Sequence, residues 1–262
     1  MLKYNPALVI VEQTLLLYLQ TLENRMRYIV VMVLMFFCGN QAFSQNFELG
    51  PYVGGANYVG DVGNTTYINP NSPVFGGLLK WNRSDRHAFR FSLLYAKIEA
   101  DDANSNEGRR LQRGYSFSNS IAEASLGLEF TFWEWDVHSD AYQSTPYLYT
   151  GVNYYYAKHF MLKNDAYTNP ANNELQEAGN NWGFSVPIAM GYKQTLNSFM
   201  AGGIEIGARY TFTDNLDGSQ PSEVDGSYRL KDFGNRNTKD WYIFTGIYLT
   251  FNFGHRSCYN KY

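Results

Sequence analysis

The sequence predicts an all-β protein that folds as an eight-stranded antiparallel transmembrane β-barrel. Three observations lead to this class: apolar and polar residues alternate over long segments, about eight such segments occur, and long connections alternate with short ones. Several segments run for 12 residues or more. Strands of soluble proteins average about 5–6 residues, whereas tilted membrane strands need about 9–11. A soluble β-sandwich is the alternative at the level of the fold.

The N-terminal region, residues 1–45, has the pattern of a signal peptide. Arg27 precedes an apolar run over 28–38, and small residues precede a cleavage site expected near Ser44 and Gln45. The run is 11 residues long, which is too short for a membrane helix of about 20 residues. We therefore expect the chain to be exported.

Met26 is the expected start of translation, with residues 1–25 upstream of the signal. A lipoprotein cut before Cys38 is an alternative, but the bulky Phe36 and Phe37 argue against it. After cleavage Cys258 is the sole cysteine, so no disulfide framework is expected.

Composition limits the classes of partner. Aromatic residues reach 17%, with 22 Tyr and 18 Phe, which suits a sheet that faces lipid. The formal net charge is -3, so the chain lacks the basic footprint of a nucleic-acid-binding protein. The cluster of Arg109, Arg110 and Arg113 is local, and we expect it in a solvated loop.

Four predicted strands alternate clearly and four more weakly. The clear strands cover 89–97, 121–132, 182–193 and 199–212; the weaker strands cover 47–60, 73–81, 145–157 and 240–253. They place the barrel in residues 46–254, followed by a short C-terminal tail over 255–262. About eight strands close a small barrel whose interior is filled by side chains.

The connections are predicted to alternate in length. Long polar connections lie at 61–71, 101–114, 158–181 and 213–239, and shorter ones at 82–86, 133–144 and 194–198. Outer-membrane barrels carry long loops outside and short turns in the periplasm. We therefore expect the outer membrane of a Gram-negative bacterium, contact with its lipid and lipopolysaccharide, and both termini in the periplasm.

Glycine and tryptophan positions fit the same prediction. The glycine pairs at 54–55, 76–77 and 202–203 lie inside predicted strands, where they allow the bends of a small barrel. All five tryptophans fall near strand ends, as an interfacial girdle would place them; they are Trp81, Trp133, Trp135, Trp182 and Trp241.

Charged residues on the polar faces of the strands are predicted to point into the lumen. Buried charges persist only when they are paired, so we expect Glu–Arg and Glu–Lys networks that fill the barrel, rather than an ion path. The predicted lumenal charges are Lys80, Arg90, Glu123, Glu129, Lys193, Glu205 and Arg209.

The sequence contains no recognisable motif for catalysis, cofactor binding or metal binding. The histidines form no H-E-x-x-H or zinc spacing, and neither a G-x-S-x-G elbow nor a P-loop occurs. His138 or His159 could serve a lipid-modifying enzyme, but surface histidines are more common. Five acids lie in predicted loops, where carboxylates could bind calcium: Asp101, Asp102, Asp214, Asp217 and Asp225. They lack a D-x-D-x-D-G register, so we expect them to be solvated.

The predicted barrel is of OmpA-like size, and several stretches of the sequence resemble the PorG-like family of outer-membrane barrels from bacteria that use type IX secretion. The similarity extends from Phe47 to Phe253, and position 215 departs from it, with Asn where relatives have an aromatic residue. The stretches are Phe47–Asp61, Arg86–Phe91, Ile98–Asn104, Ser120–Glu123, Thr145–Gly151 and Ile204–Asp217.

The resemblance implies a non-enzymatic accessory barrel of the type IX secretion system, a system that also supports gliding motility in some species. It implies association with the periplasmic ring formed by a PorK-like lipoprotein and its PorN-like partner. We expect the chain to anchor that ring through its short turns, including 133–144. Two alternatives stand: a structural or adhesin-like envelope barrel without a secretion role, and an outer-membrane lipid-modifying enzyme.

Overall fold

The computed structural model describes residues 46–162 without 138 and 140, residues 175–213, residues 216, 217 and 219, and residues 239–253. The side chains of 46, 159–162 and 175–181 are not among those described. The predicted signal peptide and the C-terminal tail both lie outside the described residues.

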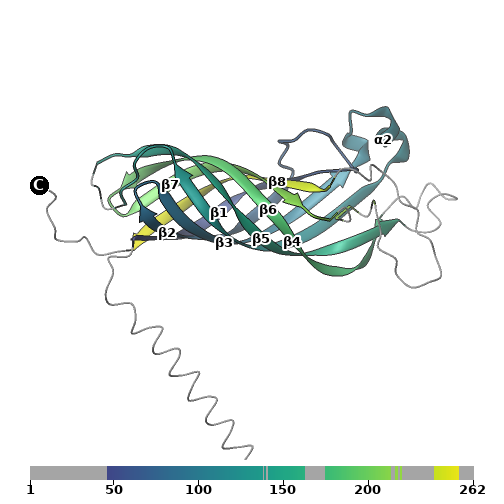
Figure 1. Cartoon of the computed structure of the whole chain (residues 1–262). Helices are drawn as coiled ribbons and strands as arrows, with labels where there is room; N and C mark the ends of the chain where they lie inside the picture. The colour runs from purple at the N-terminus through teal and green to yellow at the C-terminus, as the bar shows by residue number, and fades with distance from the viewer. Residues whose placement is uncertain are drawn as a thin grey trace, which may run out of the picture. The chain divides into compact units, whose positions relative to one another are not determined.

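Eight antiparallel strands form one closed barrel, as the sequence predicted (Figure 1). Each strand pairs with its neighbour in sequence, and β1 pairs with β8 to close the sheet. The strands are β1 Asn46–Val59, β2 Ser72–Ser84, β3 His87–Asp101, β4 Ser116–Thr131, β5 Ser144–Leu162, β6 Leu175–Asn197, β7 Met200–Thr211 and β8 Trp241–Phe253.

Side chains alternate between the outside and the inside of the barrel because successive residues of a strand point to opposite faces. On β3, for example, Leu93 and Tyr95 are 55% and 44% exposed, whereas Arg90 and Ser92 are buried. A barrel that is apolar outside and charged inside inverts the arrangement of a soluble protein. It is the arrangement of a barrel that faces lipid.

Tyrosine rings and glycines fit together inside the barrel. Tyr147 of β5 lies opposite Gly191 of β6, and its ring occupies the space that a side chain at position 191 would take. A Cβ atom added to Gly191 would lie 2.4 Å from that ring. Tyr248 and Gly203 form the same kind of pair between β8 and β7. Glycines at these positions give the large interior rings the room they need.

The predicted connection over 158–181 is wrong in its limits. Strands β5 and β6 continue as a hairpin to Leu162 and from Leu175, and only 163–174 lies between them, outside the described residues. The sequence of the added strand residues lacks the apolar alternation by which strands are recognised.

The predicted connection over 101–114 contains two short helical elements. They are the 3-10 helix η2 Asp102–Asn104 and the α-helix α2 Gly108–Arg113. Among the described residues, no helix is long and apolar enough to span a membrane.

Candidate functional site

All seven predicted lumenal charges lie inside the barrel, and each is at most 4% exposed. They come from five strands: β2, β3, β4, β6 and β7. The structure divides them into two connected groups. The first group contains Lys80, Arg90, Glu129, Lys193 and Glu205, and the second contains Glu123 and Arg209.

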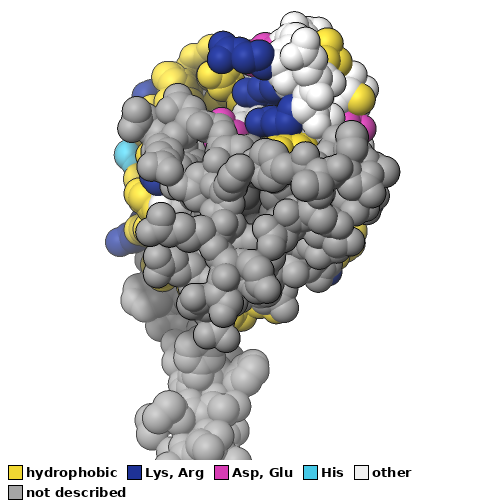
Figure 2. Space-filling view, turned by 90° about the vertical axis from the view of Figure 1, so that its right-hand side faces the viewer, with side chains coloured by type: hydrophobic (Ala, Val, Ile, Leu, Met, Phe, Trp, Pro, Cys, Tyr) yellow, Lys and Arg dark blue, Asp and Glu magenta, His cyan; other side chains and the backbone are white. Residues whose placement is uncertain are grey.

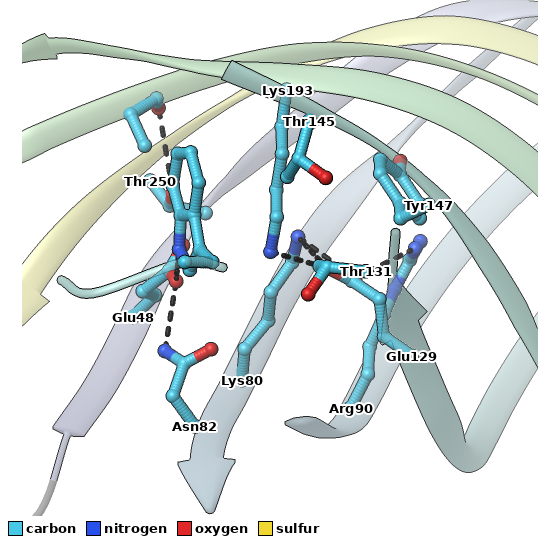
Figure 3. A network of polar contacts seen from close by, with 12 residues as sticks. Glu48, Lys80, Asn82, Arg90, Glu129, Thr131, Thr145, Tyr147, Lys193 and Thr250 are labelled. Carbon is cyan, nitrogen blue, oxygen red and sulfur yellow. Dashed lines mark hydrogen bonds and ion pairs between the residues drawn. The ribbon is translucent and has the colours of Figure 1, made fainter. Parts of the chain in front are cut away.

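Glu129 is the centre of the first group (Figure 3). The Nζ atom of Lys80 lies 2.9 Å from Oε2 of Glu129, and the Nζ atom of Lys193 lies 2.8 Å from Oε1. Arg90 Nη1 lies 3.9 Å from the same carboxylate. One buried carboxylate therefore compensates two ammonium groups and part of a guanidinium charge.

Glu205 extends this group to the opposite wall of the barrel. The guanidinium of Arg90 donates two hydrogen bonds to the Glu205 carboxylate, and the Tyr147 hydroxyl donates a third at 2.6 Å. The ring of Tyr149 lies 4.5 Å from the centre of the Arg90 guanidinium. Charge-assisted and cation–π contacts of this kind fix the position of the guanidinium.

The second group joins four strands around Glu123. The Nε and Nη2 atoms of Arg209 each lie 3.3 Å from Oε1 of Glu123. The Oε2 atom accepts hydrogen bonds from Asn153 at 2.9 Å and from the Tyr242 hydroxyl at 2.8 Å. These contacts tie β4 to β5, β7 and β8 across the lumen.

Glu48 is an eighth charge of the lumenal network, and the sequence prediction did not include it. Its carboxylate accepts hydrogen bonds from Asn82 at 2.8 Å, Thr250 at 2.8 Å and Trp135 at 3.1 Å. Glu48 alternates with apolar neighbours in the predicted strand 47–60, so the pattern used for the other seven could have identified it. With Glu48 the network holds four acidic and four basic side chains, and its formal charge is zero.

Trp135 closes the short-turn end of the barrel, so its prediction as a girdle residue was wrong. It is 3% exposed and donates its indole N–H to Glu48. The Nζ atom of Lys193 lies 4.4 Å from the centre of its ring. The Trp135 amide donates a hydrogen bond to the Asp85 carbonyl at 2.8 Å, and this bond holds the connection after β4 in place. Trp133, by contrast, is 55% exposed.

Leu216 closes the opposite end, where the long loops meet. It is fully buried in one apolar cluster with Tyr58, Ile98 and Ile121. Its amide donates to the Asp240 carboxylate at 2.9 Å, and the Tyr58 hydroxyl donates to the same carboxylate. An apolar layer therefore separates the ionic groups from this mouth.

The prediction that the loop acids are solvated was wrong for Asp102 and Asp217, which are fully buried. Asp102 accepts hydrogen bonds from the amides of Gly63 and Tyr115 and from the guanidinium of Arg113. Arg113 is therefore part of the loop structure. Figure 2 views this end and shows basic side chains gathered on one part of it. The helix α2 carries Arg109, Arg110 and Arg113.

Asp217 lies outside the membrane-spanning part and has an unusual protonation equilibrium. Its carboxylate accepts hydrogen bonds from the amides of Asp61 at 3.2 Å and Ser219 at 2.9 Å. Burial raises the pKa of Asp217 to about 6 despite these hydrogen bonds, and the nearby charge of Asp61 adds to the effect. The contacts of this loop should therefore depend on pH.

The interior is suited to holding strands together. Each of the eight charges has a polar partner, and aromatic rings and two end plugs occupy the lumen. Removing one partner of a buried pair is costly, so the network fixes the register of the strands that contribute to it. Within the described part of the chain, no group of three or more His, Cys, Asp or Glu residues could hold a metal ion.

Solved structures with similar shape include several bacterial membrane barrels. Ail, the attachment invasion locus protein of Yersinia pestis, is 8% identical, with a TM-score of 0.42 over 80% of this chain and all of that chain. OprG of Pseudomonas aeruginosa is 8% identical, with a TM-score of 0.44 over 81% of this chain and 97% of that chain. Neisserial surface protein A is 7% identical, with a TM-score of 0.44 over 79% of this chain and 97% of that chain.

No curated protein matches this sequence. One family model covers residues 26–262, which is most of the chain and includes every strand of the barrel. The chain therefore belongs to the family described as domain of unknown function DUF6089.

Proposed function

We propose that this chain is an outer-membrane β-barrel with a structural, non-enzymatic role in the cell envelope. The observation that carries the proposal is the combination of an apolar, lipid-facing exterior with an electroneutral interior that is plugged at both ends. A barrel of this kind presents its ends to partners while its wall remains in the membrane. Both termini and the short turns would face the periplasm.

The specific role that we propose is in type IX protein secretion, where the barrel would anchor the periplasmic ring of PorK-like and PorN-like proteins to the outer membrane. This role rests on the sequence resemblance described above. The connection between β4 and β5 is the proposed docking element because Trp135 fixes it to the barrel interior while Glu134 and Asp136 are exposed.

A pull-down from gently solubilised outer membranes tests this role. Tagged full-length protein should enrich the ring lipoprotein and its partner, identified by mass spectrometry. The charge reversals Glu134→Lys and Asp136→Lys should together reduce that recovery, while the heat-dependent gel shift of the folded barrel stays unchanged. Glu99→Lys, a charge reversal at the long-loop end of β3 where the side chain is 40% accessible, is the matched control. Recovery of the barrel alone, under conditions that keep the ring intact, would refute the role.

The second candidate function is an adhesin-like or structural envelope barrel that acts through its long loops. Tyr67 and Ile68 favour it because they are 68% and 57% exposed on the loop after β1. Normal cargo secretion after deletion of the gene would support this candidate over the first. The lipid-modifying alternative would use His138, which lies outside the described residues, or His159, whose side chain is not described. Unchanged lipid A and phospholipid profiles after deletion would eliminate it.

A further inference from the structure

Two neighbouring hollows lie in the outer wall of the barrel, on the side formed by β5, β6, β7, β8 and β1. The larger has a volume of about 1030 Å³ and the smaller about 600 Å³. Their walls are almost entirely apolar; Leu148, Met190 and Ile206 line the larger hollow, and Leu196 and Leu249 line the smaller.

A ridge of four side chains borders both hollows. Val53, Tyr192, Ile204 and Ile247 line each of them, and each residue is at least 40% exposed. These residues form one cross-strand row, since Tyr192 pairs with Ile204, Ile204 with Ile247, and Ile247 with Val53. With about 4.8 Å between strands, the larger hollow, which crosses five strands from β5 to β1, is roughly 19 Å long, and the smaller, which crosses four strands from β6 to β1, is roughly 14 Å long. The two hollows therefore share one ridge.

The larger hollow ends near a cation at the short-turn end. Phe132 and Pro146 line this end, and the Phe132 amide donates to the Pro146 carbonyl. The exposed Arg86 donates one hydrogen bond from Nη1 to the Phe132 carbonyl at 3.3 Å. A guanidinium has five N–H donors, so others are available to a ligand. Among the described residues, Arg86 forms no ion pair with a carboxylate.

We propose that these hollows form a binding site for one diacyl phospholipid, with an acyl chain in each hollow and the phosphate at Arg86. The two hollows, which meet at the shared ridge, match the two hydrocarbon chains of one lipid, and the cation at the rim of the larger hollow matches an anionic headgroup. Guanidinium groups bind phosphate through charge-assisted hydrogen bonds. The lipid would belong to the periplasmic leaflet, so this assignment rests on the orientation in the proposed function.

Native mass spectrometry of the purified full-length barrel in detergent tests the site. The probes are dioleoyl phosphatidylglycerol, dioleoylglycerol without phosphate, and lipid A. We expect one phosphatidylglycerol to bind and to withstand activation that strips dioleoylglycerol. Preferential binding of lipid A would overturn the phospholipid assignment, because it would place this end of the barrel in the outer leaflet.

Two variants and two matched controls separate the headgroup from the chains. Arg86→Gln should weaken phosphatidylglycerol binding about tenfold, and Met190→Trp, which fills the larger hollow, should weaken both diacyl probes. Arg83→Gln changes another exposed arginine before the same turn. Leu126→Trp adds the same bulk on β4, at a residue that is 62% exposed and lines neither hollow. Both controls should bind within about twofold of the parent.

Binding that is equal in Arg86→Gln, Met190→Trp and the controls would refute the site. The measurement uses the barrel without any protein partner, so failure here leaves the pull-down result for the periplasmic ring unaffected. Conversely, lipid binding that depends on Arg86 and Met190 would stand even if the ring is not recovered.

Discussion

Replacing Glu129 by glutamine removes the carboxylate that compensates two lysines in the barrel interior. The side chain is fully buried, with Lys80 and Lys193 at 2.9 and 2.8 Å. Among the eight interior charges, the substitution leaves four basic and three acidic groups, so the formal charge rises from zero to +1. Glutamine keeps the size of the side chain, so the change in free energy reports the charge rather than a cavity.

The expected loss of unfolding free energy is about 3–5 kcal/mol, the cost of removing one partner of a buried ion pair. Glu99→Gln is the matched control because its pair with Lys97 is exposed, with side chains 40% and 46% accessible. Exposed pairs contribute about 0.2–1 kcal/mol. Adding Lys80→Met to Glu129→Gln restores neutrality and should recover about 1–3 kcal/mol of the loss.

Urea unfolding in lipid vesicles measures these differences, with the heat-dependent gel shift and tryptophan fluorescence as independent readouts. Equal midpoints and slopes for Glu129→Gln and Glu99→Gln would refute the claim that the network holds the strands together. A further loss in the double variant, in place of recovery, would show that packing rather than charge balance sets the stability.

Three further predictions concern the two plugs and the interior glycines. Trp135→Ala should lower the unfolding free energy by about 3–5 kcal/mol, measured by urea unfolding, because it empties the short-turn mouth. Asp217→Asn should remove a pH dependence between about pH 4 and 7 from the amide hydrogen exchange of Asp61. In the parent protein the pKa of Asp217 in the folded state is about 6, so protonation as the pH falls should raise the free energy of opening this loop by up to about 3 kcal/mol. Gly203→Val should destabilise the barrel by about 1–3 kcal/mol because its Cβ would lie 2.5 Å from the ring of Tyr248.

Matched substitutions give each of these predictions a control. Trp133→Ala changes an exposed tryptophan two positions away and should alter stability by less than about 1 kcal/mol. Gly77→Val adds a side chain whose Cβ meets nothing closer than 3.6 Å, so it should be tolerated. The exchange rate of the Asp61 amide is first corrected for the intrinsic pH dependence of exchange. A corrected rate that falls as the pH rises would contradict the raised pKa of Asp217.

The strand pattern predicted the barrel because the membrane imposes a repeating rule on every strand. Each lipid-facing position must be apolar, so Leu93 and Tyr95 on one face and Arg90 on the other are recognisable without any knowledge of contacts. The same rule places Glu48 inside. The rule stops at the membrane boundary, which is why the hairpin extension to Leu162 and from Leu175 was not predicted.

The sequence by itself determined the fold class, the direction of most side chains, and which charges lie in the lumen, because all of these follow from a period of two in a closed sheet. Only the tertiary structure decided which acid meets which base, because partners such as Arg90 and Glu205 are 115 residues apart and meet across the lumen. It also decided that Trp135 and Asp217 are buried. Their exposure depends on how the connections fold over the barrel ends, and no local pattern encodes that packing.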